Sequence, residues 1–182
     1  SAASDVYKRQ EQSSGTYGVE IMRSQTFTFR SATESDRTYL QRLNFLTDVF
    51  GDERAESPSD AVSGVVQYID GWDPRRDGGV LAFDSFRTPA GGVWLRYWSD
   101  PAQGFANLGP DIPELAIAVE NRYAGQRLGE QLLEHAVSLA REQGAERVAL
   151  WVASDNARAR HRYEAFGFRD WPEIDDAMVF TL

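Results

Sequence analysis

The chain contains no cysteine, which excludes disulfides, zinc–thiolate sites and a cysteine nucleophile. It also has no apolar run near the ~18 residues that span a bilayer, and its N-terminus lacks the charged-then-apolar layout of a signal peptide. Positive charge is scarce, since 19 Lys and Arg oppose 28 Asp and Glu for a net charge of -9. Nonspecific nucleic-acid binding depends on a basic surface. We therefore expect a soluble, cytoplasmic protein with neither membrane nor nucleic-acid partners.

What the sequence does contain fits one globular domain. Its 182 residues are 42% hydrophobic and 12% aromatic, and they show no internal repeat. Residues 1–24 are rich in Ser, Gln and Gly without helical or strand periodicity, which predicts a disordered or extended tail. Residues 25–182 are then predicted to form a single domain.

Periodicity and turn signals predict the order of the elements in this domain. A strand precedes a helix that starts at Thr33 and Asp36, and a second helix from Ser59 to Gly71 has an apolar face made of Val62, Val65, Val66 and Ile69. A hairpin, a long loop at 99–113, and then strand, helix, strand, helix and two strands complete the chain. This order predicts an α+β fold of mixed α/β character. Its twisted, mostly antiparallel sheet has six to seven strands flanked by about four helices, with one parallel pair.

Two segments in the second half of the chain carry recognisable chemistry. The first, "PELAIAVENRYAGQRLGEQLL", places a glycine-containing turn directly before a helix. Backbone amides at such a turn point toward an anion, and the helix dipole adds favourable potential. Read alone, the turn is equally a helix start with two glycines for close packing. The second, "NARARHRYEAFGF", gathers three Arg and a His around Tyr163, although an arbitrary charge run usually just solvates a helix face.

Together with the element order, these two segments resemble the GNAT superfamily of acyl-CoA-dependent N-acetyltransferases, most strongly between Glu114 and Phe168. The resemblance implies a GNAT-like fold and acetyl-CoA as co-substrate. It also implies direct transfer of an acetyl group to the amine of a small molecule or peptide in a ternary complex, with no metal. The alternative is a noncatalytic CoA-binding or sensor domain of the same fold. The identity of the acceptor and the oligomeric state, a homodimer included, stay open.

The resemblance also implies which residues bind the cofactor: Ala118, Val119, Ala124, Gly125, Gln126, Arg127, Leu128, Gly129, Glu130, Asn156, Arg158 and Arg162. Amides near Ala118 and Val119 would bind the carbonyl oxygen as it gains charge. The family places Arg or Gln where Ala124 stands and a glycine where Arg127 stands. We expect the backbone cradle to remain, with Arg127 in helical dihedrals and its guanidinium directed to the phosphates.

In this family, a tyrosine at the place of Tyr163 protonates the departing thiolate, whereas most helix tyrosines are simply half-buried aromatics. Asn156, Ala159, Gly167 and Phe168 match the same pattern, although Asn156 is equally a helix N-cap. Arg158 and Arg162 share one helix face and are expected near the adenosine 3'-phosphate, while Arg160 points elsewhere.

The amine acceptor needs a base, because an amine with a pKa near ~10.4 is protonated at neutral pH. Glu114 stands where many family members carry a catalytic glutamate, and it is equally a surface carboxylate at a strand end; Asp111 and Glu120 are weaker alternatives. His135 and His161 have no partner at metal or triad spacing. Trp94, Arg96 and Trp98 share one strand face, from which we expect one Trp in the core and Arg96 in the acceptor cleft, with Trp94 also an acceptor-site candidate.

Overall fold

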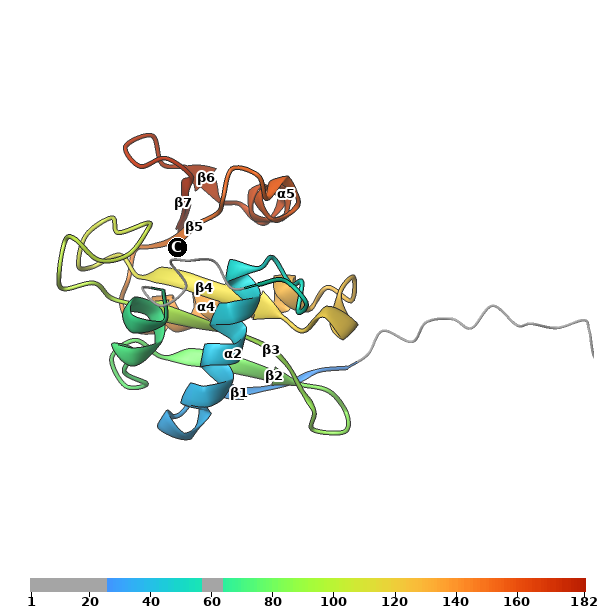
Figure 1. Ribbon diagram of the computed structural model, residues 1–182. Coiled ribbons are helices and arrows are strands. Elements are labelled where there is room, and N and C mark those ends of the chain that lie inside the picture. Colours follow the sequence, from blue (N-terminus) through green and yellow to red (C-terminus); the bar gives the residue numbers. More distant parts are fainter. Residues whose placement is uncertain (1–25, 57–63) are drawn as a thin grey trace, which may run out of the picture.

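The computed structural model describes residues 26–56 and 64–182 (Figure 1). The tail predicted at 1–24 lies outside this part. Within it, seven strands form one sheet in the order β1-β2-β3-β4-β5-β7-β6. Their bounds are β1 (Thr28–Ser31), β2 (Gly79–Phe83), β3 (Pro89–Arg96), β4 (Glu114–Val119), β5 (Arg147–Trp151), β6 (Arg169–Asp170) and β7 (Ala177–Thr181). Every pairing is antiparallel except that of β4 with β5, which confirms the predicted mostly antiparallel sheet and its parallel pair.

Helices cover both faces of this sheet. They are α2 (Arg37–Asp48), α4 (Leu128–Glu142), α5 (Ala157–Phe166) and a π-helical turn η2 (Val66–Asp70), with short 3-10 turns η1 (Glu34–Asp36) and η3 (Asn121–Tyr123). The predicted start of the first helix is confirmed, since the Asp36 carboxylate accepts a hydrogen bond from the Thr33 amide at 2.8 Å. In α4 the buried residues recur at helical spacing, and the helix ends before Gly144, whose φ is +83°.

The two faces of the sheet bury two separate apolar clusters. Leu132 and Ala136 of α4 pack with Val93, Leu95 and Leu115 of the strands, and α5 packs against this same cluster. On the opposite face, α2 and η2 pack over a second cluster that contains Leu40, Leu43, Tyr68, Trp94 and Trp98. Figure 1 shows α2 crossing in front of the strands. The alternation of side chains along β3 and β4 therefore decides on which face each functional group lies.

The second predicted helix differs from the expectation. Its start at Ser59 lies outside the described residues, and from residue 66 the chain forms a π-helical turn in which the Gly71 amide bonds the Val66 carbonyl, five residues back. The wider turn rotates the side chains, so that Val66 is 54% exposed while Tyr68 is buried. The predicted apolar face is therefore wrong at Val66, although Ile69 is buried as expected.

Residues 99–113, called the covering loop below, connect β3 to β4 and lie against the sheet. Ala106 packs with Ala149 of β5 and Ala177 of β7, and Trp171 and Ile174 of the β6–β7 connection pack against the same small cluster. The loop thus spans the place where β4 and β5 meet.

Candidate functional site

A gap between β4 and β5 forms the centre of the site. The two parallel strands pair only between Glu114 and Ala149, where the Ala149 amide donates to the Pro113 carbonyl at 2.8 Å. On its other side β4 is fully paired with β3, and the Glu120 amide donates to the Ala90 carbonyl at 2.9 Å. Because hydrogen bonds alternate along an antiparallel ladder, this register turns the amides of Ile117 and Val119 toward the gap.

The same register corrects one prediction about the carbonyl-binding amides. It directs the Ala118 amide toward β3, where the residue faces Gly92. Ala118 therefore has no free amide for a ligand in the gap, while Val119 remains a candidate and Ile117 joins it. The alternation is a property of strand pairing, so the sequence of β4 alone could not assign it.

A row of unpaired amides lies at the open end of this gap, in the turn before α4. The N–H groups of Gly125, Arg127, Leu128, Gly129 and Glu130 have no acceptor within the part of the chain that the structure describes. A methyl group added at Gly125 or Gly129 would meet nothing within 4 Å, so the turn is open rather than filled by its own side chains. Amides converging at a helix N-terminus bind anions such as phosphates. This geometry fits the predicted cradle.

Arg127 does not adopt the predicted helical dihedrals. It lies in the left-handed region, at φ 58° and ψ 20°, which glycine adopts more readily. Its guanidinium forms an exposed ion pair with Glu130, with Nη2 and Oε2 2.7 Å apart, so its charge is paired within the turn. Ala124 offers no polar side-chain atom, whereas the Gln126 Oε1 is buried without a hydrogen-bond partner in the described residues.

Tyr163 lies on α5, on the same face of the sheet as α4. Its half-buried ring packs edge-on against Phe168, with centroids 5.9 Å apart, and against the same buried cluster as Ile117 and Val119. Burial raises the pKa of Tyr163 to about 12, although the nearby charge of Arg162 opposes this. No hydrogen-bond partner for its hydroxyl is found among residues 26–56 and 64–182. The phenol therefore stays protonated and free to donate.

The basic residues of α5 differ in their surroundings. Arg160 forms ion pairs with Asp170 and Asp176, so it links α5 to β6 and to the β6–β7 connection. Arg158 and Arg162 are exposed and make no ion pair with any described residue. Asn156 is the N-cap of α5, since its Oδ1 accepts from the Ala159 amide at 3.2 Å. A cofactor contact from the Asn156 side chain would have to replace or share this bond.

Glu114 is a buried carboxyl group, not a surface carboxylate, and its side chain lies on the opposite face from Tyr163. The residue is only 2% exposed. Its Oε1 accepts from the Tyr68 hydroxyl at 2.6 Å and its Oε2 from the Trp98 indole at 2.8 Å. Burial raises the pKa of Glu114, while these two hydrogen bonds and the amides of the covering loop act to lower it. Such a carboxyl group can hold a proton nearer neutral pH than an exposed one.

Both predicted acceptor-site residues are in the core. Trp94 is fully buried and donates from its indole to the Tyr68 carbonyl at 3.2 Å. Arg96 is 4% exposed, forms an ion pair with Asp77 at 2.5 Å, and lies over the Trp98 ring at 4.6 Å. The prediction that Arg96 lines the cleft is therefore wrong. A buried guanidinium needs a carboxylate partner, and Asp77 provides it.

The two weaker candidates for the base, Glu120 and Asp111, lie in different surroundings. Both Glu120 oxygens accept hydrogen bonds from Arg42, at 2.8 and 2.7 Å; burial alone would raise the pKa of Glu120, but this pairing outweighs it and lowers the pKa. Asp111 is exposed on the covering loop.

His135 packs against the ring of Phe29. The described residues hold no group of three or more His, Asp or Glu side chains arranged to bind a metal ion, and none of their helices is long and apolar enough to cross a membrane.

Sequence reasoning missed Tyr68, the indole of Trp98 as a donor to Glu114, and the amide of Ile117. No local signal could have revealed the Tyr68–Glu114 contact, because these residues lie 46 positions apart and the π-helical turn interrupts the regular helical period.

Known proteins resemble this chain in sequence and in fold. The sequence model of the "Acetyltransferase (GNAT) family" matches residues 43–168. Streptothricin acetyltransferase of Streptomyces lavendulae is 31% identical over 161 residues, which cover 79% of this chain and 82% of that protein. Mycothiol acetyltransferase of Beutenbergia cavernae is 30% identical over 103 residues, half of this chain but only 35% of that protein.

Among solved structures, the PaiA N-acetyltransferase of Thermoplasma acidophilum, in complex with coenzyme A, matches with a TM-score of 0.64. The alignment covers 86% of this chain and 99% of that one, at 16% identity. At this level of identity the likeness supports the fold.

Proposed function

The chain belongs to the GNAT acetyltransferase family, and from this premise we propose that it transfers an acetyl group from acetyl-CoA to a primary amine. The transfer is direct, within a complex that holds both substrates. The observation that carries this proposal is the gap between β4 and β5. The two strands pair only at Glu114 and Ala149, so the side of β4 that faces β5 is unpaired beyond Glu114. The row of free amides before α4 lies at the open end of the gap.

The residues present fit acetyl-CoA, which supplies the acetyl group as a thioester. The amides of Gly125, Arg127, Leu128, Gly129 and Glu130 would hold the pyrophosphate, and the helix dipole of α4 supports the negative charge. The unpaired edge of β4 would accept and donate hydrogen bonds along the rest of the cofactor. Exposed Arg158 and Arg162 offer charge for a further phosphate.

The placement of the two ionisable groups suits direct attack. Glu114 lies on the α2 face of the sheet, whereas Tyr163 lies on the α4 and α5 face. An amine deprotonated on one side of the gap would then attack a carbonyl whose sulfur leaves toward the other side. The amides of Ile117 and Val119 face the gap between them and would donate to the carbonyl oxygen. In this arrangement Glu114 takes a proton from the amine and Tyr163 gives one to the sulfur.

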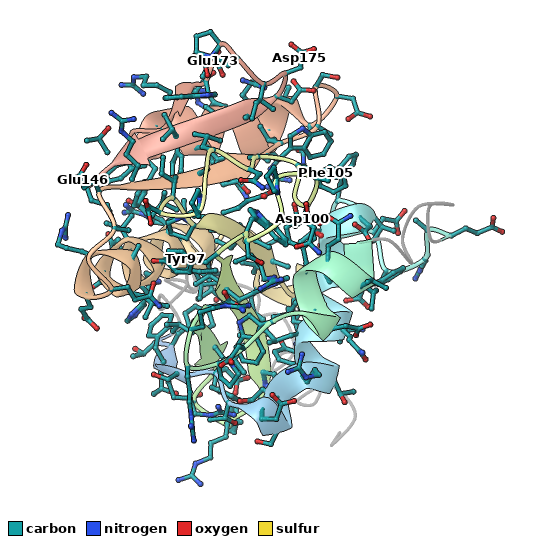
Figure 2. The ribbon with its side chains drawn as sticks, turned by 90° about the vertical axis from the view of Figure 1, so that its left-hand side faces the viewer. Tyr97, Asp100, Phe105, Glu146, Glu173 and Asp175 are labelled. Carbon is teal, nitrogen blue, oxygen red and sulfur yellow. The ribbon has the colours of Figure 1, made fainter. Side chains whose placement is uncertain are left out.

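The acceptor that we favour is a cationic amine. The chain is acidic overall, and Figure 2 shows Glu173 and Asp175 of the β6–β7 connection at the top of the molecule and Asp100 of the covering loop near its middle. These two segments pack together through Ala106 and Ile174. Negative charge on a protein surface attracts cations and raises their rate of association. Since the likeness to streptothricin acetyltransferase covers about four fifths of both chains, streptothricin heads the panel of acceptors to test.

The experiment is an assay of acetyl-CoA consumption with a panel of amines, using wild type, Tyr163→Phe and Glu114→Gln. We expect kcat to fall by ~10²- to 10⁴-fold in each variant, with little change in CoA affinity. Tyr97→Phe and Glu146→Gln are matched controls, because Tyr97 bonds Gln143 at an exposed site and Glu146 is exposed. Equal rates in wild type and both site variants would refute the two assignments. Thermal stabilisation by CoA without turnover of any amine would instead indicate a binding function.

A further inference from the structure

We propose that Tyr68 and Trp98 are positioning residues for this reaction, which hold the Glu114 side chain as an oriented carboxylate beneath the covering loop. The proposal rests on the proposed role of Glu114 as the base. It adds two residues that act through Glu114, one from a π-helical turn and one from the segment that follows β3.

The two donors divide the carboxylate between them. The Tyr68 hydroxyl donates to Oε1 at 2.6 Å, and the Trp98 Nε1 donates to Oε2 at 2.8 Å. With one donor fixed on each oxygen, rotation of the carboxylate about its last bond would break both hydrogen bonds. Hydrogen bonds to a charged group are stronger than those between neutral groups, and they favour the ionised form. Burial raises the pKa of Glu114, and these two hydrogen bonds offset part of that rise.

The rings that carry these donors are themselves fixed by packing. Tyr68 and Trp98 contact each other edge to face, with centroids 5.1 Å apart, and Phe105 stacks on Tyr68 with centroids 5.8 Å apart. The π-helical turn rotates Tyr68 into this position and leaves Val66 exposed in its place. A π-turn sacrifices regular helical hydrogen bonding and is frequent at functional sites. The π-helical turn therefore sets the position of the Tyr68 hydroxyl.

The covering loop closes over the same hydroxyl. The Phe105 amide donates to the Tyr68 oxygen at 3.0 Å, and the Gly104 amide donates to the Gln67 Oε1 at 2.8 Å. Phe105 also contacts Trp151 of β5 at 5.2 Å, so the tip of the loop reaches from η2 to β5. Figure 2 shows Phe105 at the surface of this region. The Tyr68 hydroxyl therefore joins the loop to the carboxylate through two consecutive hydrogen bonds.

Few charged groups face this cluster. Arg96 faces it from β3 and is paired with Asp77, which also pairs with Arg76. Tyr68 is the titratable group of η2 in contact with Glu114, and the covering loop contributes backbone amides. Since burial raises the pKa of Tyr68 above its usual value, it stays a protonated donor across the working range of pH. The ionisation of Glu114 thus depends mainly on its two side-chain donors and on burial.

The test is the pH dependence of kcat/KM at pH 5–9 in wild type, Tyr68→Phe and Trp98→Phe. Loss of one donor destabilises the carboxylate, so we expect the acidic limb of the profile to move to higher pH by about one pH unit in each variant. A purely structural role would lower activity without moving the limb. Tyr39→Phe is the matched control, because the Tyr39 hydroxyl donates to Glu120 at 3.2 Å on the same face of the sheet. It should leave the limb in place.

An unmoved acidic limb in Tyr68→Phe would overturn the proposal. Should that variant fail to fold, Trp98→Phe decides in the same way, because it removes the donor to the other oxygen and leaves the Tyr68 hydroxyl intact. The outcome for the proposed function is separate. If Glu114→Gln retains wild-type activity, the base assignment itself fails; if Glu114→Gln is inactive but neither variant shifts the limb, only the positioning role is refuted.

Discussion

Position 127 allows a test of how the turn before α4 is built. Arg127 occupies a left-handed conformation, with φ of 58°, directly before the first residue of the helix. A side chain in this region costs roughly 1–2 kcal/mol relative to the right-handed region, a cost that glycine avoids. We therefore expect Arg127→Gly to be more stable than Arg127→Ala, the reverse of the order at ordinary helical positions.

The magnitude follows from three contributions. Glycine removes the backbone strain of roughly 1–2 kcal/mol but increases the freedom of the unfolded chain by about 0.4–1 kcal/mol. Both variants lose the exposed ion pair with Glu130, which is worth about 0.3–0.5 kcal/mol at such a site. The ion pair cancels in the comparison, so Arg127→Gly should exceed Arg127→Ala in free energy of unfolding by about 1 kcal/mol. Relative to wild type, Arg127→Gly should be neutral or slightly more stable.

The assay is thermal or urea unfolding of both variants, with Glu134→Gly and Glu134→Ala as matched controls. Glu134 is exposed in the interior of α4, where alanine should be the more stable residue by about 1 kcal/mol. For a chain of this size, 1 kcal/mol corresponds to roughly 2–4 °C in Tm. CoA affinity should persist in both Arg127 variants, because the proposed contacts are backbone amides.

Two results would refute this reasoning. If alanine were more stable than glycine at both positions, Arg127 would not occupy the left-handed region. If either Arg127 variant lost CoA binding by more than about 100-fold while remaining folded, the side chain rather than the backbone would hold the phosphates.

Three further predictions concern stability. Hydrogen bonds from Arg30 lower the pKa of Asp36 from 3.8 to about 2, so the ionised Asp36 stabilises the fold above pH 3.8 and this stabilisation is lost as pH falls toward 2. Asp36→Asn should therefore lower the free energy of unfolding by about 1–2 kcal/mol at pH 7, and an equal loss at pH 2 would contradict this. Arg42→Met should lower the free energy of unfolding by about 3 kcal/mol or more in chemical unfolding, because the buried Glu120 loses its partner. The double variant Arg42→Met with Glu120→Gln should recover part of this free energy, and no recovery would argue against the pairing. Gly91→Ala should lower the free energy of unfolding by about 1–3 kcal/mol, since its methyl group would lie 2.6 Å from a β4 carbonyl oxygen; an unchanged Tm would show that these strands can separate.

Local sequence signals determined much of this fold. The apolar spacing of α4, the N-cap Asn156 and the hairpin of β2 with β3 depend on neighbouring residues, and the structure has all three as predicted. The glycine-containing turn at 124–129 was also visible, because Gly125, with a φ of 78°, and the helix start lie within a few positions, although the left-handed conformation of Arg127 was not predicted. Short-range geometry of this kind is set by the backbone preferences of the residues themselves.

The environment of each charged group was decided only by the tertiary structure. The sequence predicted Arg96 in a cleft, yet its charge is paired with Asp77, 19 positions away in the chain. It left Glu114 equally a surface carboxylate or a catalytic base. In the structure Glu114 is held by Tyr68 and Trp98, which lie 46 and 16 positions away. Strand pairing likewise decided that Val119 and not Ala118 turns its amide to the gap. Desolvation and hydrogen bonding act through space, so the sequence names the groups that can do chemistry while the packing of distant segments sets their charge and exposure.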